Sequence, residues 1–165
     1  MIDDPSARSR PFVAAGALFW DEAGRIMLVR PTYKDGWDLP GGYVELNEAP
    51  RETCIREVKE ELDLDVELGQ LLVADWAPHV GEGDKLLFVF EGGQLAPEQV
   101  GKIRLQADEI AEYSFFETAD LGTTLIPRLA RRVVAAIEAR AEGMTHYLEH
   151  GRAASVIPMT AGLHQ

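Results

Sequence analysis

The stretch GGYVELNEAPRETCIREVKEELDL, residues 41–64, carries the strongest fold signal in the chain. Its apolar residues Ile55, Val58 and Leu62 recur at the spacing of one helix face. Pro50 suits the first turn of such a helix, because a missing backbone N–H costs nothing there. The pattern therefore predicts a helix that begins near Pro50, directly after a glycine-rich turn.

The same helix gathers acidic residues on one face. At about 100 degrees per residue, Glu57, Glu60 and Glu61 lie together and apart from the apolar face. Like charges at these spacings repel one another. Two interpretations stay open on spacing alone: a solvated acidic face that is partly paired with Arg56 and Lys59, or carboxylates grouped around a cation such as Mg²⁺.

The wider register resembles the Nudix box, G-x5-E-x7-R-E-U-x-E-E-x-G-U, in which U is an aliphatic residue. Two positions differ from the family pattern, because Asp63 replaces the box glycine and Asn47 stands where a glycine commonly precedes the first glutamate. Asn and Asp are the non-glycine residues that best tolerate a left-handed backbone, so we expect that conformation at both positions. The matching residues are Gly42, Glu48, Arg56, Glu57, Val58, Glu60, Glu61 and Leu64.

Short apolar runs on both sides of this helix predict a sheet. The turn DEAG, residues 21–24, predicts a hairpin between the first two runs. A second helix, residues 127–142, has an apolar stripe that predicts packing on the sheet. The predicted strands are residues 12–20, 25–30, 66–76, 85–90 and 112–117, with a turn at residues 91–93.

The resemblance implies an α/β (α+β) fold, namely a Nudix-like α/β/α sandwich with a mixed β-sheet. It also implies a Mg²⁺-dependent hydrolase, with Mn²⁺ as a substitute, that cleaves the diphosphate linkage of a nucleoside diphosphate derivative through attack of a metal-activated water on phosphorus. A nucleoside triphosphate or related nucleotide is the favoured substrate. The alternatives are a non-catalytic Nudix-like domain that binds or senses a nucleotide, and an acidic interaction protein without a metal site.

The roles of the box residues follow from the same resemblance. Glu57 and Glu61 are the expected direct metal ligands, and Glu60 shares a metal or helps to activate water. The carbonyl group of Gly42, or of the glycine before it, is expected to add one oxygen ligand. Arg56 is expected to orient the carboxylates. The catalytic candidates are therefore Glu60, Glu61 and Arg56, and the metal candidates within the box are Glu57, Glu60, Glu61 and Gly42.

Glu48 is expected to support the box arginine rather than to bind metal. Family members often recruit a further acid from a distant loop, and Glu109 is the first candidate for that metal ligand, with Glu112 second. The alternative for each is an ordinary surface acid before a strand.

Three residues on the approach to the box are candidates for substrate binding. Arg30 and Lys34 could contact phosphate, although solvated side chains are the favoured alternative for both. Trp37 could stack on a base, or it could pack at the strand edge.

The length of 165 residues fits one domain. We assign residues 1–11 to an N-terminal extension, residues 12–142 to the Nudix hydrolase domain, and residues 143–165, which lack a sustained period, to a tail or oligomer arm. Such an arm would suit a homodimer.

Composition limits which binding partners and which cellular compartment we expect. The net charge of −12 opposes binding of polymeric DNA or RNA, so the expected partner is a small nucleotide. Cys54 is the only cysteine, which excludes an internal disulfide, and we expect it to be a small buried helix residue. The first residues lack the apolar stretch of a secretion signal, and no run is long enough for a membrane helix, so we expect a cytoplasmic protein.

Overall fold

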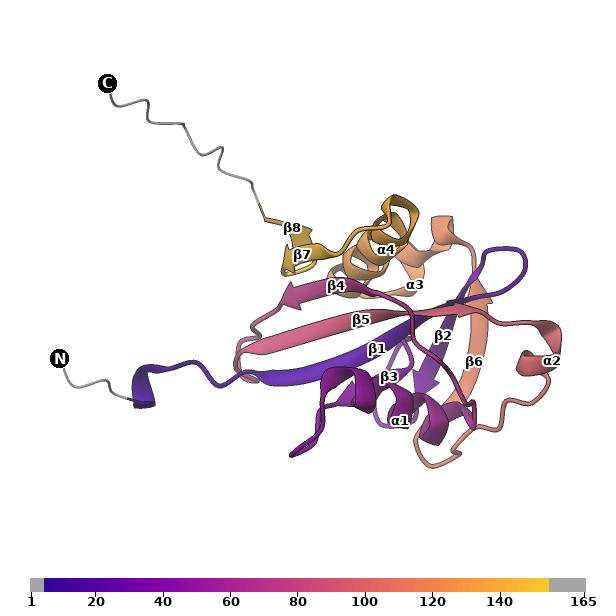
Figure 1. Cartoon of the computed structure of the whole chain (residues 1–165), viewed down its shortest axis with the longest axis horizontal. Helices are drawn as coiled ribbons and strands as arrows, with labels where there is room; N and C mark the ends of the chain where they lie inside the picture. Colours follow the sequence, from indigo (N-terminus) through magenta and orange to yellow (C-terminus); the bar gives the residue numbers. More distant parts are fainter. Residues whose placement is uncertain (1–4, 155–165) are drawn as a thin grey trace, which may run out of the picture.

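A mixed β-sheet organises the molecule (Figure 1). The structure, a computed structural model, describes residues 5–154. Within that part of the chain, eight strands form one sheet in the order β6-β2-β1-β5-β4-β7-β8, and β3 pairs with β1 beside this path. The strands are β1 (Phe12–Trp20), β2 (Ile26–Pro31), β3 (Gly41–Tyr43), β4 (Leu71–Trp76), β5 (Lys85–Gln94), β6 (Ile110–Phe116), β7 (His146–Glu149) and β8 (Arg152–Ala153).

Helices cover both faces of the sheet, with α1 on one side and α3 and α4 on the other (Figure 1). The side chains of β1 alternate between the two layers, as in any buried strand. Leu18 faces the α4 core, whereas Ala17 and Phe19 face the α1 core. The predicted α/β/α sandwich with a mixed sheet is therefore confirmed. The helices are α1 (Pro50–Leu62), α2 (Pro97–Val100), α3 (Leu121–Thr124) and α4 (Pro127–Glu142), with 3-10 turns at Pro5–Ala7 and Thr118–Asp120.

The ends of α1 confirm the expected left-handed residues. Asn47 has a φ of 67° and Asp63 a φ of 56°, so each adopts the conformation for which glycine is the usual residue. The backbone N–H of Asp63 donates to the Lys59 carbonyl at 2.9 Å, which closes the last turn of the helix. Both departures from the box pattern therefore preserve the backbone path.

The buried face of α1 differs in part from the prediction. Val58 and Leu62 are buried as expected, but Ile55 is 37% exposed and Cys54 takes its place against the sheet. This rotation also turns Glu61 inward, where it is only 4% exposed. The apolar spacing predicted the helix correctly, but the buried face is rotated from the predicted one. Apolar spacing alone does not indicate that an acidic residue is buried.

The predicted strands need correction at two boundaries and by one added strand. β4 begins at Leu71 rather than at residue 66. β5 runs through the predicted turn at residues 91–93, because a register shift opposite Leu18 and Phe19 absorbs the glycines there. β3 was not predicted, since three residues are too few to show an alternation.

The predicted tail also needs correction over its first part. Residues 143–153 contain β7 and β8, and β7 lies parallel to β4 with Val73 opposite His146. Leu148 is buried in the α4 core, so this segment belongs to the sheet. Strands of four and two residues give no sustained period, which explains why the sequence did not reveal them. Residues 155–165 of the predicted tail, and residues 1–4 of the predicted extension, lie outside the described part of the chain.

Within the same described range, no helix combines the length and apolar character needed to cross a membrane.

Candidate active site

The carboxylates of α1 meet the backbone of β3. Glu61 accepts a hydrogen bond from the Gly41 N–H at 3.0 Å. Glu57 lies against Gly42 so closely that a Cβ added there would stand 2.8 Å from Oε2 and closer still to Oε1. Only glycine leaves room for this approach. The two glycines of the sequence motif therefore hold the two glutamates at the edge of the sheet.

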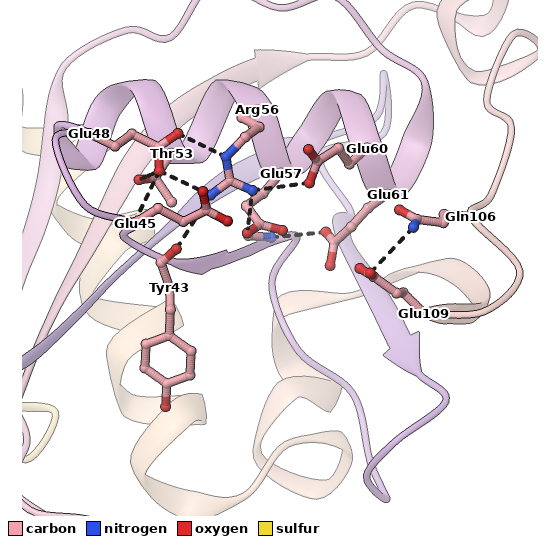
Figure 2. A network of polar contacts seen from close by, with 11 residues as sticks. Tyr43, Glu45, Glu48, Thr53, Arg56, Glu57, Glu60, Glu61, Gln106 and Glu109 are labelled. Atoms are coloured by element: carbon pink, nitrogen blue, oxygen red, sulfur yellow. Dashed lines mark hydrogen bonds and ion pairs between the residues drawn. The ribbon is translucent and has the colours of Figure 1, made fainter.

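Arg56 contacts three glutamates at once (Figure 2). Its Nε and Nη2 donate to the two oxygens of Glu48 at 2.8 and 3.0 Å, which is a bidentate pair. Its Nη1 donates to Glu57 at 2.9 Å and to Glu60 at 3.0 Å. Thr53 Oγ1 donates to Glu48 at 2.5 Å. Hydrogen bonds from Arg56 and Thr53 hold the pKa of Glu48 at about 2, so this carboxylate stays charged and fixes the guanidinium.

Negative charge accumulates around Glu61. Burial raises the pKa of Glu61 to about 8, against the opposing effect of the Gly41 hydrogen bond, and the charges of Glu57, Asp38 and Glu109 add to the rise. Burial likewise raises the pKa of Glu57, although Arg56 opposes it. A carboxylate out of water beside other carboxylates is unfavourable unless a cation compensates it. The site therefore has the electrostatics of a cation-binding position.

Of the two distal acids, Glu109 lies beside the site (Figure 2). Its loop is fastened to the end of α1, because the Gln106 N–H donates to the Glu61 carbonyl at 3.2 Å. Gln106 Nε2 also donates to the Glu109 carboxylate at 3.3 Å. Glu112 instead pairs with Arg30 at 3.1 Å across neighbouring strands. The fold brings Glu109, and not Glu112, toward the box glutamates.

The donors at this site suit a hard divalent cation. Carboxylate and backbone carbonyl oxygens are the ligands that Mg²⁺ takes, often with only one or two carboxylates supplied by the protein. No group of three or more acid, histidine or cysteine side chains in residues 5–154 is already arranged around a metal position. Of the four acidic metal candidates, Glu57 and Glu60 accept hydrogen bonds from Arg56, whereas Glu61 and Glu109 do not. The residues fit the ion in charge and donor type.

A cavity of about 230 Å³ lies beyond β3, between the sheet and the first half of α4. Gly41 and Gly42 line it, and the same two glycines contact Glu61 and Glu57. Its floor includes the small residues Ala14 and Gly16 of β1. Its polar and aromatic lining comprises Tyr33, Lys34, Asp38, Tyr43, His79, Lys85, Phe88, Arg128 and Arg132.

A family model described as the NUDIX domain matches residues 10–137. The chain belongs to the Nudix family. Among solved structures, a MutT protein from Methanosarcina mazei Go1 superposes with a TM-score of 0.66 and 26% identity, covering 83% of this chain and 99% of that one. The Nudix assignment made from residues 41–64 is thereby confirmed.

Two curated relatives match over shorter stretches. A MutT-like protein of Streptomyces ambofaciens is 42% identical over 43% of this chain and 47% of its own length. An RNA pyrophosphohydrolase of Halorhodospira halophila is 39% identical over 39% of this chain and 33% of its own length. The chain thus spans less than half the length of these relatives.

Of the three predicted substrate-binding residues outside the Nudix box, one lines the cavity and two do not. Lys34 lines the cavity and pairs with Asp38 at 2.5 Å. Arg30 is not part of the lining, and neither is Trp37, which packs edge-on against Phe116 with ring centroids 4.9 Å apart. Sequence reasoning missed the basic residues His79, Lys85, Arg128 and Arg132 of the cavity lining, because they come from distant elements and share no motif.

Proposed function

We propose that this Nudix protein is a Mg²⁺-dependent pyrophosphohydrolase that cleaves the diphosphate linkage of a nucleoside diphosphate derivative. The observation that carries the proposal is the contact of Glu57 and Glu61 with Gly41 and Gly42, the two glycines that also line the cavity. Acids and cavity share these two glycines, so a substrate in the cavity would extend its phosphates toward the acids.

Glu57, Glu61 and Glu109, with the Gly42 carbonyl, would hold the metal. When bound, Mg²⁺ or Mn²⁺ supplies charge neutralisation for the diphosphate and Lewis acidity for its attack by water. Glu60, which is the more exposed of the box glutamates, would accept the proton of the attacking water, with Glu61 as the other candidate. Arg56 would fix the orientation of Glu57 and Glu60, and Glu48 would hold Arg56.

The size of the cavity limits which part of the substrate it can hold. Its volume of about 230 Å³ is below the range of about 300–1,000 Å³ that holds drug-sized ligands, so it suits one ring system of a substrate whose remainder lies outside the cavity. Nucleoside triphosphates and related nucleotides stay the favoured substrates, as the family resemblance implies. The relative described as an RNA pyrophosphohydrolase supports cleavage of a pyrophosphate linkage, but not the choice of a mononucleotide.

The test is a panel of nucleotides incubated with Mg²⁺ or Mn²⁺, with separation of products to distinguish pyrophosphate from phosphate release. We expect Glu61→Gln to lose at least about 100-fold in kcat, because it removes charge at the metal position while keeping the acceptor for Gly41. Glu98→Gln, an exposed change on α2 away from the cavity, is the matched control. Binding of nucleotides without turnover would favour the non-catalytic alternative, and equal turnover by Glu61→Gln would refute the proposed metal site.

A further inference from the structure

Arg132 of α4 is a charged side chain fixed in the interior. Its side chain is only 8% exposed, and its Nε donates to Asp75 Oδ2 at 2.7 Å. Asp75, on β4, is fully buried and accepts a second hydrogen bond from the Gly151 N–H at 3.0 Å through its other oxygen. Asp75 on β4 therefore holds the guanidinium in one orientation between the sheet and α4.

One end of this guanidinium has no hydrogen-bond partner in the described part of the chain. Nη2 is buried and makes no hydrogen bond to any group in residues 5–154. Leaving a buried donor unpaired is unfavourable, and buried donors in native proteins are nearly always satisfied. Arg132 lines the cavity, so the unused donor belongs to a side chain that borders the proposed substrate site, and a small shift of that side chain is needed to bring the buried nitrogen to the cavity surface. A ligand acceptor in the cavity would satisfy it.

Charge balance indicates which kind of acceptor this is. Asp75 already compensates the charge of Arg132, Asp38 pairs with Lys34, and Glu82 pairs with Lys85. Lys34, Lys85 and Arg132 are thus compensated, whereas Arg128 has no acidic partner within residues 5–154 and leaves one positive charge at the cavity for a phosphate. A neutral oxygen, such as a carbonyl group on a ring, matches a compensated guanidinium better than an anion does.

The surroundings suit a flat ring. The floor from β1 is made of small residues, Ala14 and Gly16, and Leu87 and Val89 of β5 line the same cavity. Ligand sites of this kind are mostly apolar, with a few polar groups that set specificity.

We infer that Arg132 is a specificity-determining residue that donates from Nη2 to the exocyclic carbonyl oxygen of the substrate's nucleobase. Guanine and uracil or thymine present such an oxygen, whereas adenine and cytosine present an amino donor at the corresponding position. An amino group would leave two donors facing each other without an acceptor. The enzyme accordingly selects keto bases over amino bases. This inference rests on the proposed function for the identity of the ligand.

The experiment compares GTP with ATP and UTP with CTP, measuring kcat and KM for the wild type, Arg132→Lys and Arg132→Met. The wild type should favour the keto member of each pair by about 10-fold or more in kcat/KM, the size expected for one hydrogen bond to a charged donor. Both variants should lose that preference. Arg152→Met, on the exposed β8 strand and outside the cavity lining, is the matched control and should keep it.

A binding measurement separates this inference from the proposed hydrolase activity. Titration calorimetry with GMP and AMP, which needs no turnover, should give the same keto preference in the wild type and its loss in Arg132→Lys. Urea unfolding identifies a variant that fails to fold, and Asp75→Leu/Arg132→Met then serves as the replacement, because it removes both buried charges together. The inference is overturned if the wild type does not discriminate, if Arg132→Lys keeps the preference, or if every nucleotide weakens equally, which would assign Arg132 to phosphate or sugar. Absent turnover together with keto-selective binding would refute the hydrolase proposal alone.

Discussion

Substituting Gly42 by alanine should disable the site without unfolding the protein. The added Cβ would stand 2.8 Å from Oε2 of Glu57 and closer to Oε1, whereas ordinary contacts lie at 3.4–4 Å. The carboxylate ends a flexible side chain, so it can retreat by roughly an ångström while β3 stays in place. A displacement of about 1 Å at a catalytic group can cost about 100-fold in rate. We therefore expect kcat to fall about 100-fold, with little change in the free energy of unfolding.

The assay is nucleotide hydrolysis with Mg²⁺, run alongside urea unfolding of the same preparations. Gly122→Ala is the matched control, because a Cβ at that α3 position meets nothing within 4 Å. It should keep full activity and be as stable as the wild type or slightly more stable, since alanine restricts the unfolded chain. Wild-type kcat in Gly42→Ala would refute the argument that the glycine exists to admit Glu57. A loss of activity matched by a loss of several kcal/mol of stability would show instead that β3 had moved.

Three further outcomes follow from buried or paired groups. Burial raises the pKa of the Cys54 thiol to about 12, so iodoacetamide should label it only after unfolding, and rapid native labelling would contradict its buried position. The pKa of Glu48 is lowered from 4.5 to about 2, so its charge stabilises the fold above pH 4.5 and that contribution disappears as pH falls toward 2. Glu48→Gln should thus have a lower free energy of unfolding than the wild type at pH 7, as measured by urea unfolding. The difference between the two proteins should shrink as the pH falls. A difference that does not change with pH would exclude the ion pair as its cause. Asp75→Leu should cost about 3–5 kcal/mol, because it leaves the Arg132 guanidinium buried alone, and Asp75→Leu/Arg132→Met should recover most of that loss; additive losses would mean that the two residues do not interact.

The box and its neighbourhood were predictable because they are local in sequence. The spacing of Glu57, Glu60 and Glu61 fixes their common helix, and a one-turn offset is enough to bring Arg56 to Glu60. The left-handed backbone of Asn47 and Asp63 was predictable for a similar reason, since this conformation is a property of single residues. The sandwich followed from the resemblance to the Nudix family, and the apolar runs and the two amphipathic helices agreed with it.

The cavity could not be predicted, because its residues meet only through the sheet. Lys85 begins β5 and Arg132 lies on α4, and no spacing in the chain relates them. Asp75 and Arg132 are 57 residues apart and come from elements that pack face to face. Trp37 illustrates the reverse case, since its position next to the box suggested a substrate contact whereas its ring packs against Phe116. Proximity in sequence predicts backbone geometry better than it predicts what a side chain touches.

The orientation of α1 is unfavourable for the stability of the fold, because it buries an acid and exposes an apolar side chain. A helix that buried Ile55 and exposed Glu61 would gain apolar contact and avoid desolvating a carboxylate, yet the structure buries Glu61 to 4% and leaves Ile55 37% exposed. One backbone N–H, that of Gly41, compensates the acid only in part. The remaining stability must come from elsewhere in the sandwich, namely from the two apolar cores on either side of the sheet. An acid kept in such a position at the expense of local stability is what a cation-dependent active site requires, and a solvated acidic face would not require it.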